Sequence, residues 1–198
     1  MSVAILPSTP THTVAFAYDQ LDALRSRLVG RLITASSPDF DEARKVLYVT
    51  VDRRPLAVVR AVNGEDVAAA VGFARDRDLP LAVRSGGHSL AQYSMIDGAV
   101  VVDLSAMKRI SIDPDARIAR VQAGATSGDL AGPANAYGLA LSTGDTASVG
   151  MGGLTTGGGI GFMVRKYGLA IDNLLSAQVV TAAGEIVTAS EFEHPDLF

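Results

Sequence analysis

Apolar residues recur at helical spacing near the start of the chain. Leu21, Leu24 and Leu28 lie three and four residues apart and are followed by Gly30, which predicts an amphipathic helix that ends there. A second helix is predicted to begin at Pro38, because proline is favoured at the first helical position. The apolar stripe of this second helix consists of Phe40, Ala43, Val46 and Leu47.

The next part of the chain predicts a strand–helix–strand unit. Residues 56–60 and 81–84 are short apolar runs, typical of buried strands. Between them Asn63 can cap a helix, and Asp66 stands at the capping-box position. The apolar residues at helical spacing in this helix are Val67, Ala70, Val71 and Ala74. So close a succession of strand, helix and strand indicates parallel strands, and residues 99–103 predict a third strand.

The pattern changes in the second half of the chain. Residues 117–123 alternate between polar and apolar, as a half-exposed strand does. Residues 126–137 favour a helix, although they include two glycines and a proline. Residues 175–181 and 185–188 predict two strands joined as a hairpin through 182–184. This half is therefore predicted to be mostly antiparallel.

These elements predict an α+β fold, with a small parallel βαβ unit followed by a mostly antiparallel sheet with helices. We divide the chain into a helical lead-in, residues 1–54, and two subdomains, residues 55–108 and 109–198. A chain of 198 residues is long enough to bury a core, since about 70% of the unfolded surface is buried at this size.

Composition and charge exclude several classes of protein. Apolar residues make up 48% of the chain and charged residues 19%, which excludes a disordered chain. The net charge of −4 argues against a nucleic-acid partner, which needs a basic stripe. Without cysteine there is no disulfide, cysteine nucleophile or thiolate metal site. No secretory signal or membrane-spanning stretch is evident, so we expect a soluble, cytoplasmic protein that does not associate with membranes.

Glycine is concentrated in one part of the chain. Nine of the 20 glycines lie between residues 144 and 168. Residues 150–161, which we call the second glycine loop, alternate glycines with apolar residues. A flexible linker would be polar, so this pattern favours a segment that packs closely against a large flat ligand.

The first glycine loop, residues 84–89, reads Arg-Ser-Gly-Gly-His-Ser directly after a predicted strand. Adjacent glycines can expose consecutive N–H groups that hold an anion such as a pyrophosphate, although a plain tight turn is the alternative. His88 has little core to join here, which favours a functional role over a structural one. Neither loop has Rossmann, Walker or nucleophile-elbow spacing. His12, His88 and His194 lack metal-ligand spacing, so no metal site is predicted.

Several ordered motifs resemble those of the flavin-linked oxidases of the vanillyl-alcohol oxidase superfamily, and most nearly its berberine bridge enzyme-like branch. The motifs are residues 84–89, 97–98, 101–105, 149–161, 167–174 and 179–184. The resemblance extends from about Pro55 to the last residue. It implies a FAD-binding fold of two α+β subdomains with the cofactor between them.

The resemblance also implies roles for individual residues. The first glycine loop would cradle the pyrophosphate, and His88 would be joined covalently to the 8α-methyl group of the flavin. The second glycine loop would pass along the ribityl chain and isoalloxazine, and Val187 would touch the adenine side. The implied cofactor-binding residues are Arg84, Ser85, Gly86, Gly87, His88, Ser89, Ser94, Thr146, Val149, Gly150, Gly153, Leu154, Gly157, Gly158, Gly159, Gly161 and Val187.

The chain departs from the family pattern in three respects. Many of these enzymes form a second flavin bond through a cysteine where this chain has Thr146, and most have glycine where it has Gln92. Family members also continue into the rest of the flavin domain and a substrate domain that supplies the general base. We therefore assign no catalytic residue here, and expect that the apolar end at Phe198 marks a fragment.

Three functions remain open at this stage. The first is the FAD-binding portion of an oxidase that takes hydride from an alcohol, sugar or amine carbon of a small-molecule substrate, with FAD attached covalently through His88. The second is a non-catalytic FAD-binding module or partner subunit. A reductase that uses NADPH is a weaker third. The substrate, the electron acceptor and the oligomeric state are not determined.

Overall fold

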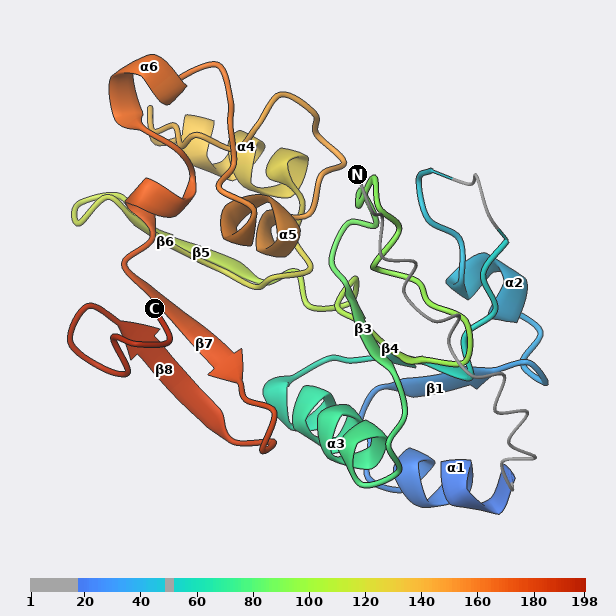
Figure 1. Ribbon diagram of the computed structural model, residues 1–198. Helices are drawn as coiled ribbons and strands as arrows, with labels where there is room; N and C mark the ends of the chain where they lie inside the picture. Colours follow the sequence, from blue (N-terminus) through green and yellow to red (C-terminus); the bar gives the residue numbers. More distant parts are fainter. Residues whose placement is uncertain (1–17, 49–51) are drawn as a thin grey trace, which may run out of the picture.

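Two regions of different construction lie side by side in the structure (Figure 1). The computed structural model describes residues 18–48 and 52–198. Its first part, up to residue 108, contains a four-stranded sheet, and we call it the sheet region. The second part, residues 109–198, contains two separate two-stranded hairpins and short helices, and we call it the hairpin region. The structure therefore confirms the α+β class, but the antiparallel half holds two hairpins instead of one sheet.

The sheet has the strand order β1-β2-β4-β3. Strands β2 (Ala57–Arg60) and β3 (Leu81–Arg84) both run parallel to β4 (Val100–Asp103), which lies between them. The strand–helix–strand prediction is confirmed, with the third strand inserted between the first two. Strand β1 (Arg31–Thr34) pairs antiparallel with β2. The pattern did not predict β1, because it contains only two apolar residues, Leu32 and Ile33, between polar ones.

Helices cover both faces of this sheet, so its strands are apolar on both sides (Figure 1). Helices α1 (Tyr18–Arg25) and α3 (Gly64–Arg75) pack on the face that presents Val59 and Val102. Helix α2 (Phe40–Ala43) packs on the other face, which presents Val58 and Val101. The alternation of neighbouring valines between two buried faces explains the continuous apolar runs in the sequence.

The first two helices are shorter than predicted. Helix α1 ends at Arg25 and leaves Leu28 outside, and α2 begins at Phe40 and not at Pro38. Val46 and Leu47 therefore lie beyond α2, in the segment that leads toward the first glycine loop. The division of the chain at residues 54 and 108 stays a prediction. The predictions about a signal at the N-terminus and about His12 fall outside the described residues.

The start of α3 is fixed by two polar side chains. The side chain of Asn63 accepts a hydrogen bond from the Asp66 N–H at 2.9 Å, which confirms the predicted cap. Asp66 does not complete a capping box. Its buried carboxylate instead accepts the N–H groups of Val29, Gly30 and Val62 at 2.8–3.0 Å. Asp66 thus holds the residues directly before β1 against the start of α3.

The hairpin region begins with β5 (Ile110–Asp113) and β6 (Ile118–Val121), of which only β6 was predicted. Helix α4 (Ser127–Asn135) confirms the predicted helix, and Thr126 and Asp129 form a complete capping box at its start. The short helices α5 (Met151–Thr156), α6 (Val164–Tyr167) and η1 (Ile171–Asn173) follow in that order.

The chain ends with the hairpin of β7 (Ser176–Val180) and β8 (Ile186–Ser190), as predicted. This hairpin contacts α3 of the sheet region, where the Arg75 guanidinium donates to the Ala183 carbonyl at 2.7 Å. Among the described residues no helix is long and apolar enough to cross a membrane.

Candidate functional site

The two glycine loops meet where the sheet region touches the hairpin region. A Cβ atom on Gly86 would lie 2.3 Å from the Gly150 nitrogen, and one on Gly150 would lie 2.2 Å from the Gly86 nitrogen. No side chain fits at either position, so the two backbones can approach this closely only because both residues are glycine. The hydroxyl of Ser85 donates to the Ala123 carbonyl and adds a polar bond across the same junction.

A cavity of about 390 Å³ opens beside this junction, within the range of small-molecule sites. Ten of the residues implied by the resemblance line it: Ser85, Gly86, Gly87, His88, Ser89, Ser94, Val149, Gly150, Gly153 and Leu154. Sequence reasoning missed two further lining residues, Val83 and Tyr93. Their signal was weak, because Val83 belongs to the apolar strand β3 and Tyr93 lies in a stretch without periodicity.

The first glycine loop offers hydrogen-bond donors to this cavity. The N–H groups of residues 86–89 donate to no other atom of the described residues. Gly87 has a positive φ of 72°, the conformation in which successive N–H groups can turn toward one anion. The Ser94 hydroxyl is buried against the same cavity and has no hydrogen-bond partner among the described residues. Since buried donors are nearly always paired, this hydroxyl and the loop N–H groups are available to a ligand in the cavity.

Arg84 does not line the cavity, although the resemblance implied it as a cofactor-binding residue. Its guanidinium is buried and binds the Asp103 carboxylate, with Nη2 and Oδ2 2.7 Å apart. Its Nη1 donates to the Lys45 carbonyl at 2.8 Å. Arg84 therefore ties the end of β3 to its neighbours and fixes the first residue of the loop.

Asp103 is the buried centre of this ion pair. Burial raises the pKa of Asp103, but hydrogen bonds and charge from Arg84, with further bonds from the Ser105 N–H and Arg60, bring that pKa below its usual value. The carboxylate is therefore charged at neutral pH. Its partners span β2, β3 and the turn after β4, so it holds together the strand ends behind the first glycine loop.

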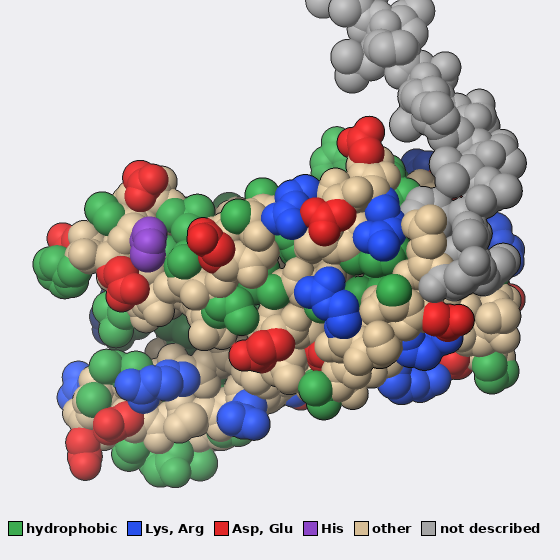
Figure 2. Space-filling model, turned by 90° about the horizontal axis from the view of Figure 1, so that it is seen from below, with side chains coloured by type: hydrophobic (Ala, Val, Ile, Leu, Met, Phe, Trp, Pro, Cys, Tyr) green, Lys and Arg blue, Asp and Glu red, His purple; other side chains and the backbone are tan. Residues whose placement is uncertain are grey.

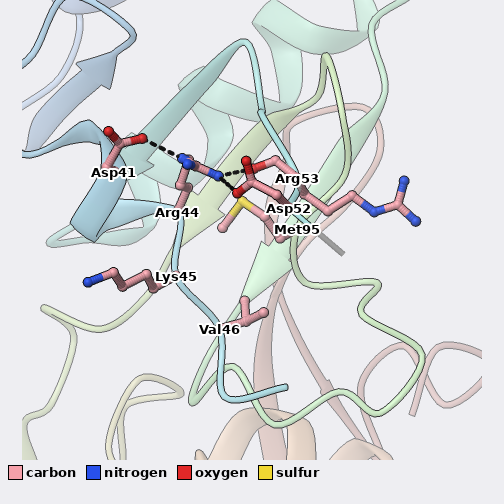
Figure 3. A pocket seen from close by; sticks show the side chains of 7 residues that line it. All are labelled: Asp41, Arg44, Lys45, Val46, Asp52, Arg53 and Met95. Atoms are coloured by element: carbon pink, nitrogen blue, oxygen red, sulfur yellow. Dashed lines mark hydrogen bonds and ion pairs between the residues drawn. The ribbon is translucent and has the colours of Figure 1, made fainter. Parts of the chain in front are cut away.

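The segment after α2 packs against the outer side of the same loop. The Leu47 N–H donates to the Gly87 carbonyl at 3.2 Å. A smaller cavity of about 150 Å³ lies beside this segment, where Arg44 sits between Asp41 and Asp52 and the guanidinium of Arg53 points away (Figure 3). Arg44 also donates to the Arg53 carbonyl at 2.9 Å. Its charge is thus already matched, and the cluster serves to hold the chain beside the first glycine loop.

His88 projects from the first glycine loop at the cavity. Its ring is half-buried, and Nε2 lies 3.0 Å from the Ser148 hydroxyl oxygen. Ser148 comes from the turn before the second glycine loop, and sequence reasoning did not single it out. The pairing therefore joins the two loops through side chains as well as through their glycines.

Comparison with known proteins agrees with this geometry. Residues 55–190 match the model of the family described as FAD binding domain. The chain belongs to this FAD-binding family. It is 41% identical over 169 residues to (R)-6-hydroxynicotine oxidase from Paenarthrobacter nicotinovorans, which covers 85% of this chain and 37% of that protein. The chain spans about two fifths of the length of the curated relatives it matches.

Solved structures of oxidases share the fold of this FAD-binding chain. The berberine bridge enzyme-like protein 1 of Physcomitrella patens matches with a TM-score of 0.85 and 33% identity, over 89% of this chain and 39% of that one. Glucooligosaccharide oxidase from Acremonium strictum matches with a TM-score of 0.84 and 35% identity, over 90% and 38%. That oxidase is described as carrying a 6-S-cysteinyl, 8α-N1-histidyl FAD.

The residues of the cavity fit FAD. Unpaired N–H groups in the first glycine loop suit the negative charge of a pyrophosphate, and the buried Ser94 hydroxyl provides a further donor. Gly86 and Gly150 let the two loops that line the cavity come into backbone contact at its edge. Among the described residues no cluster of three acidic or histidine side chains is placed to hold a metal ion.

Besides Arg84, six of the implied residues lie outside this cavity, namely Thr146, Gly157, Gly158, Gly159, Gly161 and Val187. Thr146 is exposed and its hydroxyl bonds to Asp145. Gly158 and Gly159 have positive φ values of 98° and 78°, and their carbonyls accept the N–H groups of Ile171 and Ala170. The second glycine loop is helical from Met151 to Thr156. Gly158 and Gly159 turn the chain after this helix so that it pairs with residues 170 and 171. Their contact with FAD stays a prediction, as does that of Val187 on β8.

Gln92 has the left-handed conformation, with a φ of 59°. Most non-glycine residues avoid this region, at a cost of roughly 1–2 kcal/mol. The family resemblance implied glycine at this position, and the backbone indeed has the conformation that glycine adopts freely. Gln92 therefore adopts a backbone conformation that is strained for a residue with a side chain.

Proposed function

We propose that this chain is the FAD-binding portion of a flavin-dependent oxidase and that FAD is attached covalently to His88. The observation that carries the proposal is the position of the His88 ring, which projects from the first glycine loop into the cavity beside Gly150. The loop N–H groups would hold the pyrophosphate, and the ring would meet the flavin. FAD, when bound, supplies a ring system that accepts hydride from a substrate carbon.

Attachment would exchange one hydrogen on the 8α-methyl carbon for a bond to a His88 ring nitrogen. One proton would leave the methyl carbon and one the ring nitrogen, together with two electrons, and dioxygen would take up both protons and both electrons as hydrogen peroxide. Only one covalent bond is possible here, because Thr146 stands where a second bond would need a cysteine and the chain has none.

The substrate is proposed to be a small molecule with an oxidisable alcohol, sugar or amine carbon. The relatives include an oxidase of (R)-6-hydroxynicotine and oxidases named for oligosaccharides, which supports this range. The cavity residues of this chain contain no carboxylate or lysine that could serve as a general base. We therefore assign no general base for substrate deprotonation to the residues that line this cavity.

Acid denaturation tests the covalent bond. The protein loaded with FAD is precipitated in acid, washed, and measured by absorbance in the flavin bands. We expect colour to stay on the polypeptide of the unaltered chain and to be lost from His88→Ala. His194→Ala is the matched control, because that ring bonds to the Thr188 carbonyl in the hairpin region, and it should keep its colour. Equal loss of colour from the unaltered chain and from His88→Ala contradicts the proposal.

A second candidate function is a FAD-binding module that has no turnover of its own. The observation that favours it is that none of the residues that line the cavity is a carboxylate or a lysine. An oxidation assay of this chain on a panel of alcohols, sugars and amines distinguishes the two candidates. Turnover is measured as the production of hydrogen peroxide. Turnover by this chain alone excludes the second candidate.

A further inference from the structure

Among the described residues the His88 ring has one polar contact, the Ser148 hydroxyl at 3.0 Å from Nε2. None of the residues that line the cavity is Asp, Glu, Lys or Arg, so no charged group there orients the imidazole. Nδ1 has no hydrogen-bond partner among the described residues. Ser148 is therefore the one polar side chain among the described residues that can bias the orientation and tautomer of this ring.

Ser148 is presented to the ring from a fixed backbone. The carbonyls before and after it, of Ala147 and Val149, each accept an N–H group at the start of α4 at 2.9 Å. Gly150 forms a β-bridge with Thr126 and leaves no room for a side chain against Gly86. A donor or acceptor held by its surroundings in this way loses little freedom when it forms a hydrogen bond.

Two polarities of this hydrogen bond are possible. If the Ser148 hydroxyl donates to Nε2, a neutral ring must carry its proton on Nδ1, and Nδ1 then has no free lone pair. If Nε2–H donates to Ser148, the lone pair of Nδ1 is free. Water can accept the remaining proton in either polarity, from Nδ1–H of the half-buried ring or from the hydroxyl of the exposed Ser148. The two polarities therefore differ only in whether the Nδ1 lone pair is free to form a bond.

We propose that Ser148 is a positioning residue that keeps the proton of His88 on Nε2 and leaves Nδ1 as the nitrogen that bonds to the flavin. This inference rests on the proposed covalent function. A ring bonded to carbon through Nδ1 can carry a proton only on Nε2. The bond from Nε2–H to Ser148 is therefore compatible with the ring both before and after attachment, whereas the opposite polarity has to be reversed.

The first test needs no flavin. The full chain is labelled with ¹⁵N-histidine, and the His88 tautomer is measured by NMR at a pH well above the ordinary histidine pKa of about 6.5. We expect the Nε2–H tautomer in the unaltered chain. Ser148→Ala should lower the ratio of Nε2–H to Nδ1–H about three- to tenfold, the effect of one hydrogen bond. Ser148→Thr keeps a hydroxyl and should restore the ratio.

Two comparisons control this measurement. Ser111→Ala makes the same change at an exposed position on β5 and should leave the ratio unaltered. The His88→Ala variant assigns the signals. A predominant Nδ1–H tautomer in the unaltered chain overturns the proposal, and so does a ratio that Ser148→Ala does not change.

A second readout locates the bond to the flavin. The flavin peptide is isolated by proteolysis, and NMR identifies the ring nitrogen that is bonded. We expect Nδ1 in the unaltered chain and a mixture of Nδ1 and Nε2 in Ser148→Ala. Attachment through Nε2 in the unaltered chain overturns the inference but leaves the proposed function intact. An unaltered chain without any bound flavin overturns the proposed function, while the tautomer ratio still decides whether Ser148 controls the ring.

Discussion

The sheet region and the hairpin region keep very different amounts of apolar surface away from water. Both apolar core clusters of the structure lie between Leu21 and Met107, in the sheet region. In the hairpin region Ile160, Phe162 and Phe192 are 75–91% exposed. Hydrophobic side chains also reach the surface among charged ones on the face in Figure 2. The sheet region thus has its own hydrophobic driving force for folding, while the hairpin region depends more on its loops and its contacts with the sheet region.

The site lies where these two regions meet, and this explains its construction. The sheet region supplies a loop fixed from behind by Arg84 and Asp103. The hairpin region supplies Gly150 and Ser148, held mainly by backbone hydrogen bonds. A ligand that fills the cavity between them would contact both, so cofactor binding should stabilise the hairpin region more than the sheet region.

The largest expected effect comes from the ion pair behind the first glycine loop. Asp103→Ala leaves the buried Arg84 guanidinium without its partner, which should lower the free energy of unfolding by about 3–5 kcal/mol. Asp22→Ala removes an exposed ion pair with Arg25 and should cost less than about 1 kcal/mol. Urea denaturation of both variants measures the difference. Equal effects of the two substitutions would show that the buried pair does not anchor the sheet region.

The lowered pKa of Asp103 predicts how the stability of the protein depends on pH. The pKa of Asp103 is lowered in the folded state, so its contribution to stability is complete above the ordinary carboxyl value of 3.8. That contribution is lost as the pH falls below this value toward the folded pKa. The unaltered chain should therefore lose more stability than Asp103→Asn between about pH 4 and pH 2. Parallel stability curves for the two proteins in that window contradict this assignment.

Core truncation compares the two regions directly. Ile33 is fully buried on β1, and Ile33→Ala should lower the free energy of unfolding by about 2–5 kcal/mol. Phe162 is 87% exposed, and Phe162→Ala should change it by less than about 0.5 kcal/mol. Thermal and urea denaturation provide the measurement. A large loss of stability from Phe162→Ala would mean that the hairpin region buries this side chain against another surface in solution.

The smallest of these effects concerns the junction between the regions. A Cβ atom on Gly150 has no room beside Ser85 and Gly86, so Gly150→Ala should cost about 1–3 kcal/mol and weaken FAD binding. The control Gly132→Ala lies on an exposed part of α4 with open space around it, and should stabilise the protein by roughly 0.5–1 kcal/mol. Flavin titration and denaturation separate the two effects. Normal FAD binding by Gly150→Ala would show that the glycine loops need not touch.

Local patterns predicted the elements that depend on neighbouring residues. The Asn63 cap, helix α4 and the β7–β8 hairpin follow from side chains and turn residues a few positions apart, and each was found. Strands β1 and β5 escaped prediction because each contains only two apolar residues, whereas the predicted four-residue strands contain three. The early end of α2 also escaped prediction, for a different reason. An apolar stripe does not distinguish a helix from the segment that follows it.

For the site, the amino-acid sequence alone identified the two glycine loops, His88 and the FAD-binding family, because glycine pairs and ordered motifs are visible residue by residue. Only the tertiary structure shows which side chains contact these residues. Arg84 binds Asp103, 19 residues away, and His88 contacts Ser148, 60 residues away. Contacts over such separations depend on how the two regions pack against each other, and no local spacing encodes that packing.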